Sequence, residues 1–169
     1  MNMTTAPLKV RIYGDPCLRK KSKPLKEVGP GERMLFKAMI ETMRQAKGVG
    51  LAAPQVGINQ RFFVMDVGDG PAVIINPRVI KKAGLCVLEE GCLSIPEVTI
   101  EIERPQKVTV CFMNEDGKLM EMACEELAAR VVLHETDHLN GKLIVDYASH
   151  SEKVKFKDQL KALESRSNK

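Results

Sequence analysis

The chain has 169 residues, of which 44% are hydrophobic and 28% charged, a composition that excludes a disordered chain and fits one globular domain over residues 1–169. The net charge of +4 is mild and no nucleic-acid-binding motif accompanies it, so we expect no sequence-specific nucleic-acid partner. No apolar run approaches the length of a membrane span, and residues 1–16 carry no secretory signal, which predicts a cytoplasmic protein without membrane contact. Five cysteines without a C-x-x-C pair favour a reducing compartment over a disulfide framework.

The first half of the chain predicts a turn, a helix, an irregular segment and then strands. Residues 14–16 form the turn, and residues 30–47 form a helix with apolar side chains at i, i+4 and i+8 spacing. The helix face expected to be buried holds Met34, Leu35, Ala38, Met39, Thr42, Met43 and Ala46. Residues 48–57 contain three glycines and one proline, which predicts an irregular backbone. Strands are expected over residues 61–67, 72–76 and 78–88.

The second half predicts further strands and two helices. Residues 98–104 alternate between apolar and polar, as in a half-buried strand, and residues 107–113 and 118–124 flank the hairpin turn Asn-Glu-Asp-Gly. One helix is expected over residues 125–140, with Gly141 as its C-terminal cap, and a highly charged helix over residues 151–165. The expected fold class is α+β, with antiparallel or mixed β-sheets packed around a central helix and with one N-terminal and one C-terminal helix.

The central helix carries the segment LHETDHLNG, residues 133–141, which contains the pattern HExxH. Positions four apart lie on one helix face, so His134 and His138 can offer two imidazole nitrogens to one metal ion. Glu135 lies beside the first histidine, where its carboxylate can take a proton from water activated by that ion. The pattern fixes only three positions, so by itself it leaves a chance match and a metal site equally open.

Catalytic sites of this kind use three protein ligands, and the sequence downstream does not supply the usual third one. The protease pattern HExxHxxGxxH continues through Gly141 but has Ile144 at the position of its last histidine, which argues against the metzincin proteases. His150, near the charged C-terminal segment, is expected to be a surface residue. The carboxylates formally available to another kind of protease are Asp146, Glu152 and Glu164.

Upstream, Cys92 is the cysteine whose surroundings suit a metal ligand. In the segment EGCLS it follows a glycine, in what we expect to be a short loop between two strands. A glycine there allows a tight turn that brings the thiol to the apex of the loop. The other cysteines are expected to be structural: small core residues at Cys86, Cys111 and Cys124, and turn packing at Cys17.

Three segments together resemble a known family. GVGLAAPQVG (48–57), EGCLSIP (90–96) and HETDHLNG (134–141), in this order, are similar to the three signature motifs of the peptide deformylases. The opening GDPCLR (14–19) also resembles the start of that family, so the resemblance spans residues 12 to about 146. It implies an enzyme that hydrolyses the N-formyl group from the formylmethionine of nascent chains and releases formate.

The resemblance implies a metal held by Cys92, His134 and His138, with the fourth position open to water. Glu135 would act as general base and then as general acid. Two imidazoles and a thiolate suit Zn²⁺, Fe²⁺, Ni²⁺ or Co²⁺. The resemblance favours Fe²⁺ as the physiological ion.

The resemblance also implies how an N-formylmethionyl peptide would be bound. Gln55 would donate its side-chain amide to the oxyanion, together with the backbone N–H of Leu93. Val49 and Gly50 would line a groove in which backbone groups pair with the peptide like an added strand. Val131, on the helix turn before the first histidine, is suited to line an apolar methionine pocket. The basic, amphipathic last helix leaves a transient ribosome contact open, although such a helix is usually a solvated face.

The chain departs from the family pattern at two positions next to the ligands. Leu133 stands where the family usually has a glutamine, and Thr136 replaces an aliphatic residue, whereas an arginine such as Arg130 also occurs in the family. These departures affect the shape of the pocket or a hydrogen bond around the ligands. The alternatives are another HExxH metallohydrolase, such as a peptidase, and an inactive metal-binding homologue. The first lacks its downstream ligand, and the second requires the loss of Glu135, Gln55 or a ligand, all of which are present.

Overall fold

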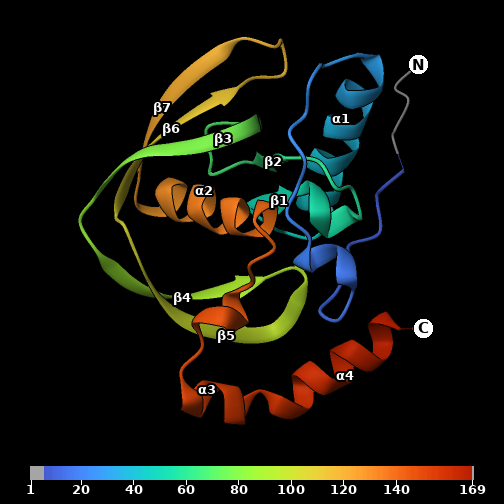
Figure 1. Cartoon of the computed structure of the whole chain (residues 1–169), viewed down its shortest axis with the longest axis vertical. Coiled ribbons are helices and arrows are strands. Elements are labelled where there is room, and N and C mark those ends of the chain that lie inside the picture. Colours follow the sequence, from blue (N-terminus) through green and yellow to red (C-terminus); the bar gives the residue numbers. More distant parts are fainter. Residues whose placement is uncertain (1–5, 169) are drawn as a thin grey trace.

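Helix α2 (Glu126–Leu139) lies between two antiparallel β-sheets in the structure of this chain, a computed structural model that describes residues 6–168 (Figure 1). Within these residues the larger sheet has the order β1-β2-β3-β6-β7, and β4 pairs with β5 in the smaller one. The strands are β1 (Gly50–Ala52), β2 (Phe62–Met65), β3 (Ala72–Ala83), β4 (Cys86–Cys92), β5 (Ile95–Arg104), β6 (Lys107–Met113) and β7 (Leu119–Glu125). The predicted α+β class is confirmed.

The remaining helices cover the outer faces of the sheets. The helices are α1 (Pro30–Gln45), α3 (His150–Lys155) and α4 (Lys157–Ser167), with short 3₁₀ helices η1 (Pro16–Arg19), η2 (Ala53–Val56) and η3 (Ile144–Tyr147). Phe36, Met39 and Met43 of α1 are buried in one apolar cluster with residues of β1, β2 and β3. The buried face of α1 is narrower than predicted, because Met34 is 54% exposed and Ala46 is exposed as well.

The strands within residues 72–88 differ from the prediction because Asn76 contacts a segment that is distant in the sequence. β3 runs through Asn76 and Pro77 with a shift of register instead of ending there. Asn76 has a φ of 51°, and its side chain accepts from the N–H of Leu25 at 2.9 Å and donates to the carbonyl of Leu25 at 2.8 Å. Gly84, with a φ of 65°, then makes the turn into β4.

Two other segments also differ from the prediction. The glycine-rich segment 48–57 is not irregular throughout, since it contains β1 and η2. The predicted helix over residues 151–165 is two helices, α3 and α4, which meet at Phe156. Phe156 and Leu163 are buried in a cluster with Val98, Ile100 and Ile102 of β5, so burial of Phe156 accompanies the break. These β5 residues confirm the predicted alternation of that strand.

Helix α2 is anchored on both sides and at its end. Ala129, Val132 and Leu133 are buried in a cluster with residues of the larger sheet, so the departure at Leu133 is an apolar core residue. Gly141 has a φ of 72° and follows the helix as predicted, and a Cβ there would collide with the backbone of Arg19. Among residues 6–168, no helix is long and apolar enough to cross a lipid bilayer. A single domain over residues 1–169, a range that includes the undescribed residues 1–5 and 169, stays a prediction.

Candidate metal centre and active-site cavity

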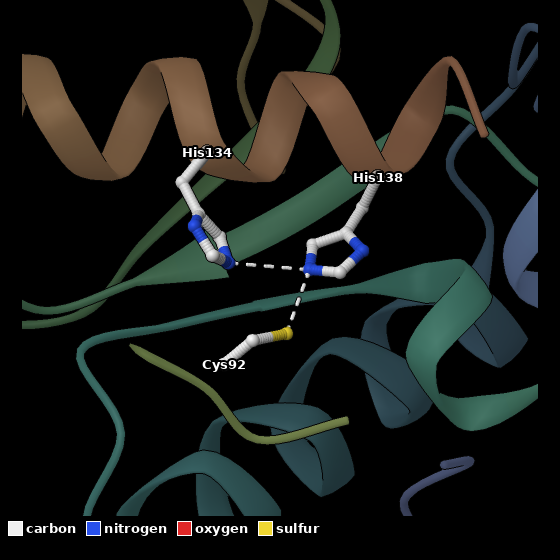
Figure 2. Close-up of side chains that lie close together, drawn as sticks. All are labelled: Cys92, His134 and His138. Carbon is white, nitrogen blue, oxygen red and sulfur yellow. Dashed lines mark hydrogen bonds between the residues drawn. The ribbon is translucent and has the colours of Figure 1, made fainter. Parts of the chain in front are cut away.

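Three candidate ligands converge between α2 and the end of β4 (Figure 2). The Nε2 atoms of His134 and His138 lie 3.2 Å apart, and the Sγ of Cys92 lies 3.3 Å from Nε2 of His138. The three ligand atoms all lie within 4.8 Å of one another. The prediction placed Cys92 in a loop, but the structure shows it as the last residue of β4. There it pairs with Ile95 across the turn into β5. Two imidazoles and a thiol so arranged are a donor set that fits one divalent transition-metal ion.

Glu135 is buried beside these ligands and lies against β1. A Cβ at Gly50 would collide with the Glu135 carboxylate, so the glycine leaves the room that this side chain occupies. The Oε2 atom of Glu135 has no hydrogen-bond partner among the described residues. Burial raises the pKa of Glu135 to about 7. A carboxyl group with such a pKa is suited to accept and return a proton near neutral pH.

Gln55 is only 1% exposed, and its side-chain amide is held in one orientation. Its Oε1 accepts from the N–H of Ala52 at 2.9 Å, and its Nε2 donates to Ser94 Oγ at 3.1 Å. The same Nε2 lies 3.7 Å from the Sγ of Cys92. The donor side of the amide therefore faces the candidate metal ligands. Ser94 was not identified from the sequence, although it lies in the EGCLS segment.

A cavity of about 420 Å³ opens onto the ligands, and all predicted site residues except His138 line it. His138 is buried beneath them. Val131 contributes a buried apolar wall, and Val49 is 42% exposed at the rim. Leu127 of α2 is 52% exposed and lines the cavity as well.

The strand β1 offers a free edge to this cavity. The carbonyl of Val49 accepts from the N–H of Asp66 at 2.9 Å and is therefore engaged on the β2 side. Ala52 directs its N–H away from β2, to Gln55. Because backbone groups two residues apart in a strand point the same way, those of Gly50 also face the free edge. At this edge Gly50, more than Val49, has backbone groups available for an added strand.

A buried ion-pair network that the sequence analysis did not identify lies behind His134. The carboxylate of Glu90 accepts from His134 Nδ1 at 3.0 Å and from Arg130 Nη1 at 2.7 Å. Arg104 donates to the same carboxylate through Nε at 2.5 Å and Nη2 at 2.9 Å, and through Nη1 to Asp137 at 2.9 Å. One sequence signal was present, since Glu90 stands two residues before Cys92 and alternation puts both on one strand face.

The network and the burial of the site set its protonation. Burial alone would raise the pKa of Glu90, but hydrogen bonds from His134 and Arg104 outweigh it and bring the pKa down to about 2. Burial alone would lower the pKa of His134, whereas its interactions with Cys92 and Glu90 raise that pKa well above the usual value. Burial, and then the charge of His134, lowers the pKa of His138. The two histidines are therefore electrostatically distinct.

The remaining sequence candidates lie outside this centre. Asp146 accepts from Arg19 Nη1 at 2.6 Å and from the N–H of Leu143 at 2.9 Å, so its carboxylate stabilises the backbone at the start of η3. Ile144 is buried in the cluster under β5, and His150 is exposed as predicted. The structure therefore provides no support for the peptidase alternative.

The other cysteines are only partly as predicted. Cys124 is buried and Cys17 donates to the carbonyl of Pro54 at 3.3 Å, in agreement with the prediction. Cys86 and Cys111 are only partly buried, which corrects their assignment to the core. They lie on strands whose sheets have one solvent-facing side, so an apolar strand sequence did not imply full burial.

An HExxH helix, a third ligand from a strand end and an apolar cavity above them define a metal-dependent hydrolase. The profile of the polypeptide deformylase family matches residues 7–154. The chain therefore belongs to the polypeptide deformylase family. It is an enzyme of the type that removes the N-formyl group from nascent polypeptides, in a family that depends on a metal ion.

Other peptide deformylases share much of their sequence with this chain, and those of known structure also share its fold. A peptide deformylase of Thermotoga petrophila is 48% identical over 153 residues, which cover 90% of this chain and 93% of that protein. The crystal structure of peptide deformylase from Thermotoga maritima is 49% identical with a TM-score of 0.84, covering 86% of this chain and 99% of that one. The enzyme of Synechococcus elongatus, solved in complex with actinonin, is 37% identical with a TM-score of 0.87, covering 93% and 90%.

Proposed function

We propose that Cys92, His134 and His138 hold one divalent ion and that deformylation takes place at this centre. The observation that carries the proposal is the convergence of the three ligand atoms within 4.8 Å at the cavity floor. A bound ion would supply a Lewis acid for the formyl oxygen and would lower the pKa of water. We propose Fe²⁺ as the physiological ion, with Zn²⁺, Ni²⁺ and Co²⁺ also accepted by this donor set.

Glu135 is the residue we propose for proton transfer. It takes a proton from the water that attacks the formyl carbon, and the carbonyl becomes a tetrahedral oxyanion. It then returns the proton to the amine nitrogen as the C–N bond breaks, which releases formate and a free N-terminus. The Oε2 atom of Glu135 is buried in the cavity wall and has no hydrogen-bond partner among residues 6–168, which supports this role.

We propose that Gln55 and the backbone N–H of Leu93 stabilise the oxyanion. The bond from Ala52 fixes the amide of Gln55 with its donor side toward the ligands, so little reorganisation is needed during the reaction. Removing one such donor typically costs about 10²–10³ in rate. The expected result for Gln55→Ala is therefore a loss in kcat of this order.

The cavity itself supports binding of an N-formylmethionyl peptide. Val131, Leu93 and Leu127 supply apolar walls, and its volume of about 420 Å³ accommodates an unbranched methionine side chain. The peptide backbone is proposed to pair with Gly50 at the free edge of β1, with Val49 at the rim. Actinonin, bound in the Synechococcus elongatus enzyme, is proposed to occupy the same cavity here.

A cytoplasmic location and a transient contact with the ribosome are the finer parts of the proposal. Basic residues on α3 and α4 support the second, among them Lys153, Lys155, Lys157 and Lys161. An electrostatic contact of this kind weakens as salt is added, because exposed charges are screened. Co-sedimentation with ribosomes at low and high salt tests it, and equal binding at both would contradict it.

The test of the function is formate release from formyl-Met-Ala-Ser by protein prepared without oxygen, with metal content measured on the same samples. We expect Cys92→Ser to lose metal and activity, and Glu135→Gln to keep metal and lose turnover. Cys111→Ser is the matched control, since this partly buried thiol lies on β6 and does not line the cavity. Unchanged metal and activity in Cys92→Ser would overturn the assignment.

A further inference from the structure

The carboxylate of Glu90 lies on the side of the His134 ring that faces away from the other ligands. Its Oε2 is 3.0 Å from His134 Nδ1, whereas Nε2 of the same ring points to Nε2 of His138 at 3.2 Å. The carboxylate is buried, with 5% of its side-chain surface exposed, so water does not compete freely for this hydrogen bond. Glu90 thus contacts a ligand without facing the metal position.

The chemistry of this pair fixes which ring nitrogen carries the proton. A neutral imidazole has one N–H, and an ionised carboxylate can only accept. In the neutral ring that a metal ligand requires, the proton of His134 therefore resides on Nδ1, and the lone pair of Nε2 is left for the metal. His138 has no such arrangement, since its buried Nδ1 finds no hydrogen-bond partner among residues 6–168. Of the two histidines, His134 is therefore the one whose Nδ1 is held by a carboxylate.

Glu90 is itself held in place by two arginines. Arg104 donates to the Glu90 carboxylate through Nε and Nη2, and Arg130 of α2 donates to it at 2.7 Å. Arg130 also donates to the carbonyls of Ile102 at 3.1 Å and Cys86 at 2.7 Å. Because β4 carries both Glu90 and Cys92, these hydrogen bonds hold β4, which supplies the thiol ligand, against α2, which supplies the two imidazole ligands.

We propose that Glu90, anchored by Arg104, is a positioning residue that fixes the tautomer and orientation of His134 and thereby sets the metal affinity of the centre. The inference rests on the proposed function, because it takes Cys92, His134 and His138 as the ligands. Partners of this kind are typically worth 10–100-fold in metal affinity.

The test compares Zn²⁺ affinity of the full-length chain with that of Glu90→Gln and Glu90→Asp, by competition with a chromophoric chelator. Glu90→Gln keeps the shape and removes the charge, whereas Glu90→Asp keeps the charge and withdraws it by one methylene from His134. We expect affinity to fall about 10–100-fold in each variant. The matched control is Tyr147→Phe, which deletes a hydroxyl that donates to Asp137 at 2.7 Å in the same buried region, and affinity is expected to change less than about threefold.

A second readout separates positioning from a merely structural role. Long-range ¹H–¹⁵N spectra of the imidazoles in metal-free protein, recorded at a pH at which His134 is neutral, report the tautomer of each histidine. We expect His134 to carry its proton on Nδ1 in the parent chain and in Tyr147→Phe, and to become a mixture of tautomers in Glu90→Asp. The spectrum of His138 serves as an internal reference, because Glu90 does not contact that ring.

The outcomes distinguish this inference from the proposed function. Glu90 variants that bind Zn²⁺ like the parent, or that lose no more affinity than Tyr147→Phe, would overturn the inference while loss of binding in Cys92→Ser still supports the metal site. If Cys92→Ser binds Zn²⁺ unchanged, the proposed function fails first. If Glu90→Gln does not fold, Glu90→Asp decides. Failure of both to fold would assign Glu90 to hairpin stability and overturn the positioning role.

Discussion

Replacing Gly50 by alanine tests how closely the structure constrains Glu135. A Cβ at this position collides with Oε1 of Glu135 and comes within 2.9 Å of its Cδ and 3.0 Å of its Cγ. The φ of Gly50 lies outside the left-handed region, so the clash and not backbone strain accounts for the effect. Glu135 is buried on α2 and lines the cavity, so its carboxylate must move away from β1 to relieve the collision.

The size of the effect follows from the geometry. Relieving the collision takes a displacement of the carboxylate on the order of 1 Å, and a misplacement of that size can cost about 100-fold in rate. Inserting a methyl group into a packed region costs about 1–3 kcal/mol of unfolding free energy. We therefore expect Gly50→Ala to lower kcat about 100-fold with metal content unchanged, and to remain folded at 25 °C.

The assay is formate release from formyl-Met-Ala-Ser, with metal content and urea unfolding measured on the same protein. Gly31→Ala is the matched control, because a Cβ there meets no atom within 4 Å and the residue lies in α1. It should keep full activity and gain up to about 1 kcal/mol from helix propensity. A Gly50→Ala enzyme with the parent kcat would refute the reasoning about Glu135.

Three further predictions concern stability and reactivity. Thr136→Val should raise the melting temperature by about 2–4 °C, because it removes a buried hydroxyl that has no partner among the described residues and is worth about 1 kcal/mol; a fall in the melting temperature would contradict this. Asn76→Ala should lower the unfolding free energy, measured by urea denaturation, by about 3 kcal/mol. The change deletes both hydrogen bonds to Leu25 and leaves a non-glycine residue at a φ of 51°. A loss below about 1 kcal/mol would contradict this prediction. Burial, followed by the hydrogen bond and charge of Asp15, raises the pKa of the Cys17 thiol to about 12, so iodoacetamide at pH about 8 should label Cys111 well before Cys17 in a mass-spectrometric time course; equal rates would count against it.

Local patterns in the sequence predicted those parts of the site that depend on local geometry. The spacing of His134 and His138 fixes their common helix face, and Gly141 ends that helix with the expected left-handed backbone. The third ligand came from a motif, and the structure corrects its setting from a loop to the last residue of β4. Such features are local, so a single sequence carries them.

The parts that sequence reasoning missed depend on contacts between distant segments. Arg104 pairs across the hairpin with Cys86, yet its guanidinium reaches along the strand to Glu90 and across to Asp137. Nothing in the local pattern around Arg104 indicates these partners, because a charged residue at a strand end is usually solvated. The continuation of β3 through Asn76 depends in the same way on Leu25, 51 positions away.

The most direct test of the metal centre is X-ray absorption at the metal edge of protein loaded with Zn²⁺. The ligand set of Cys92, His134 and His138 predicts one sulfur near 2.3 Å and two imidazole nitrogens at about 2.0–2.1 Å. The sulfur scattering should vanish in Cys92→Ser and persist in Cys111→Ser. A parent spectrum without sulfur, or a sulfur shell that survives Cys92→Ser, would contradict the central claim.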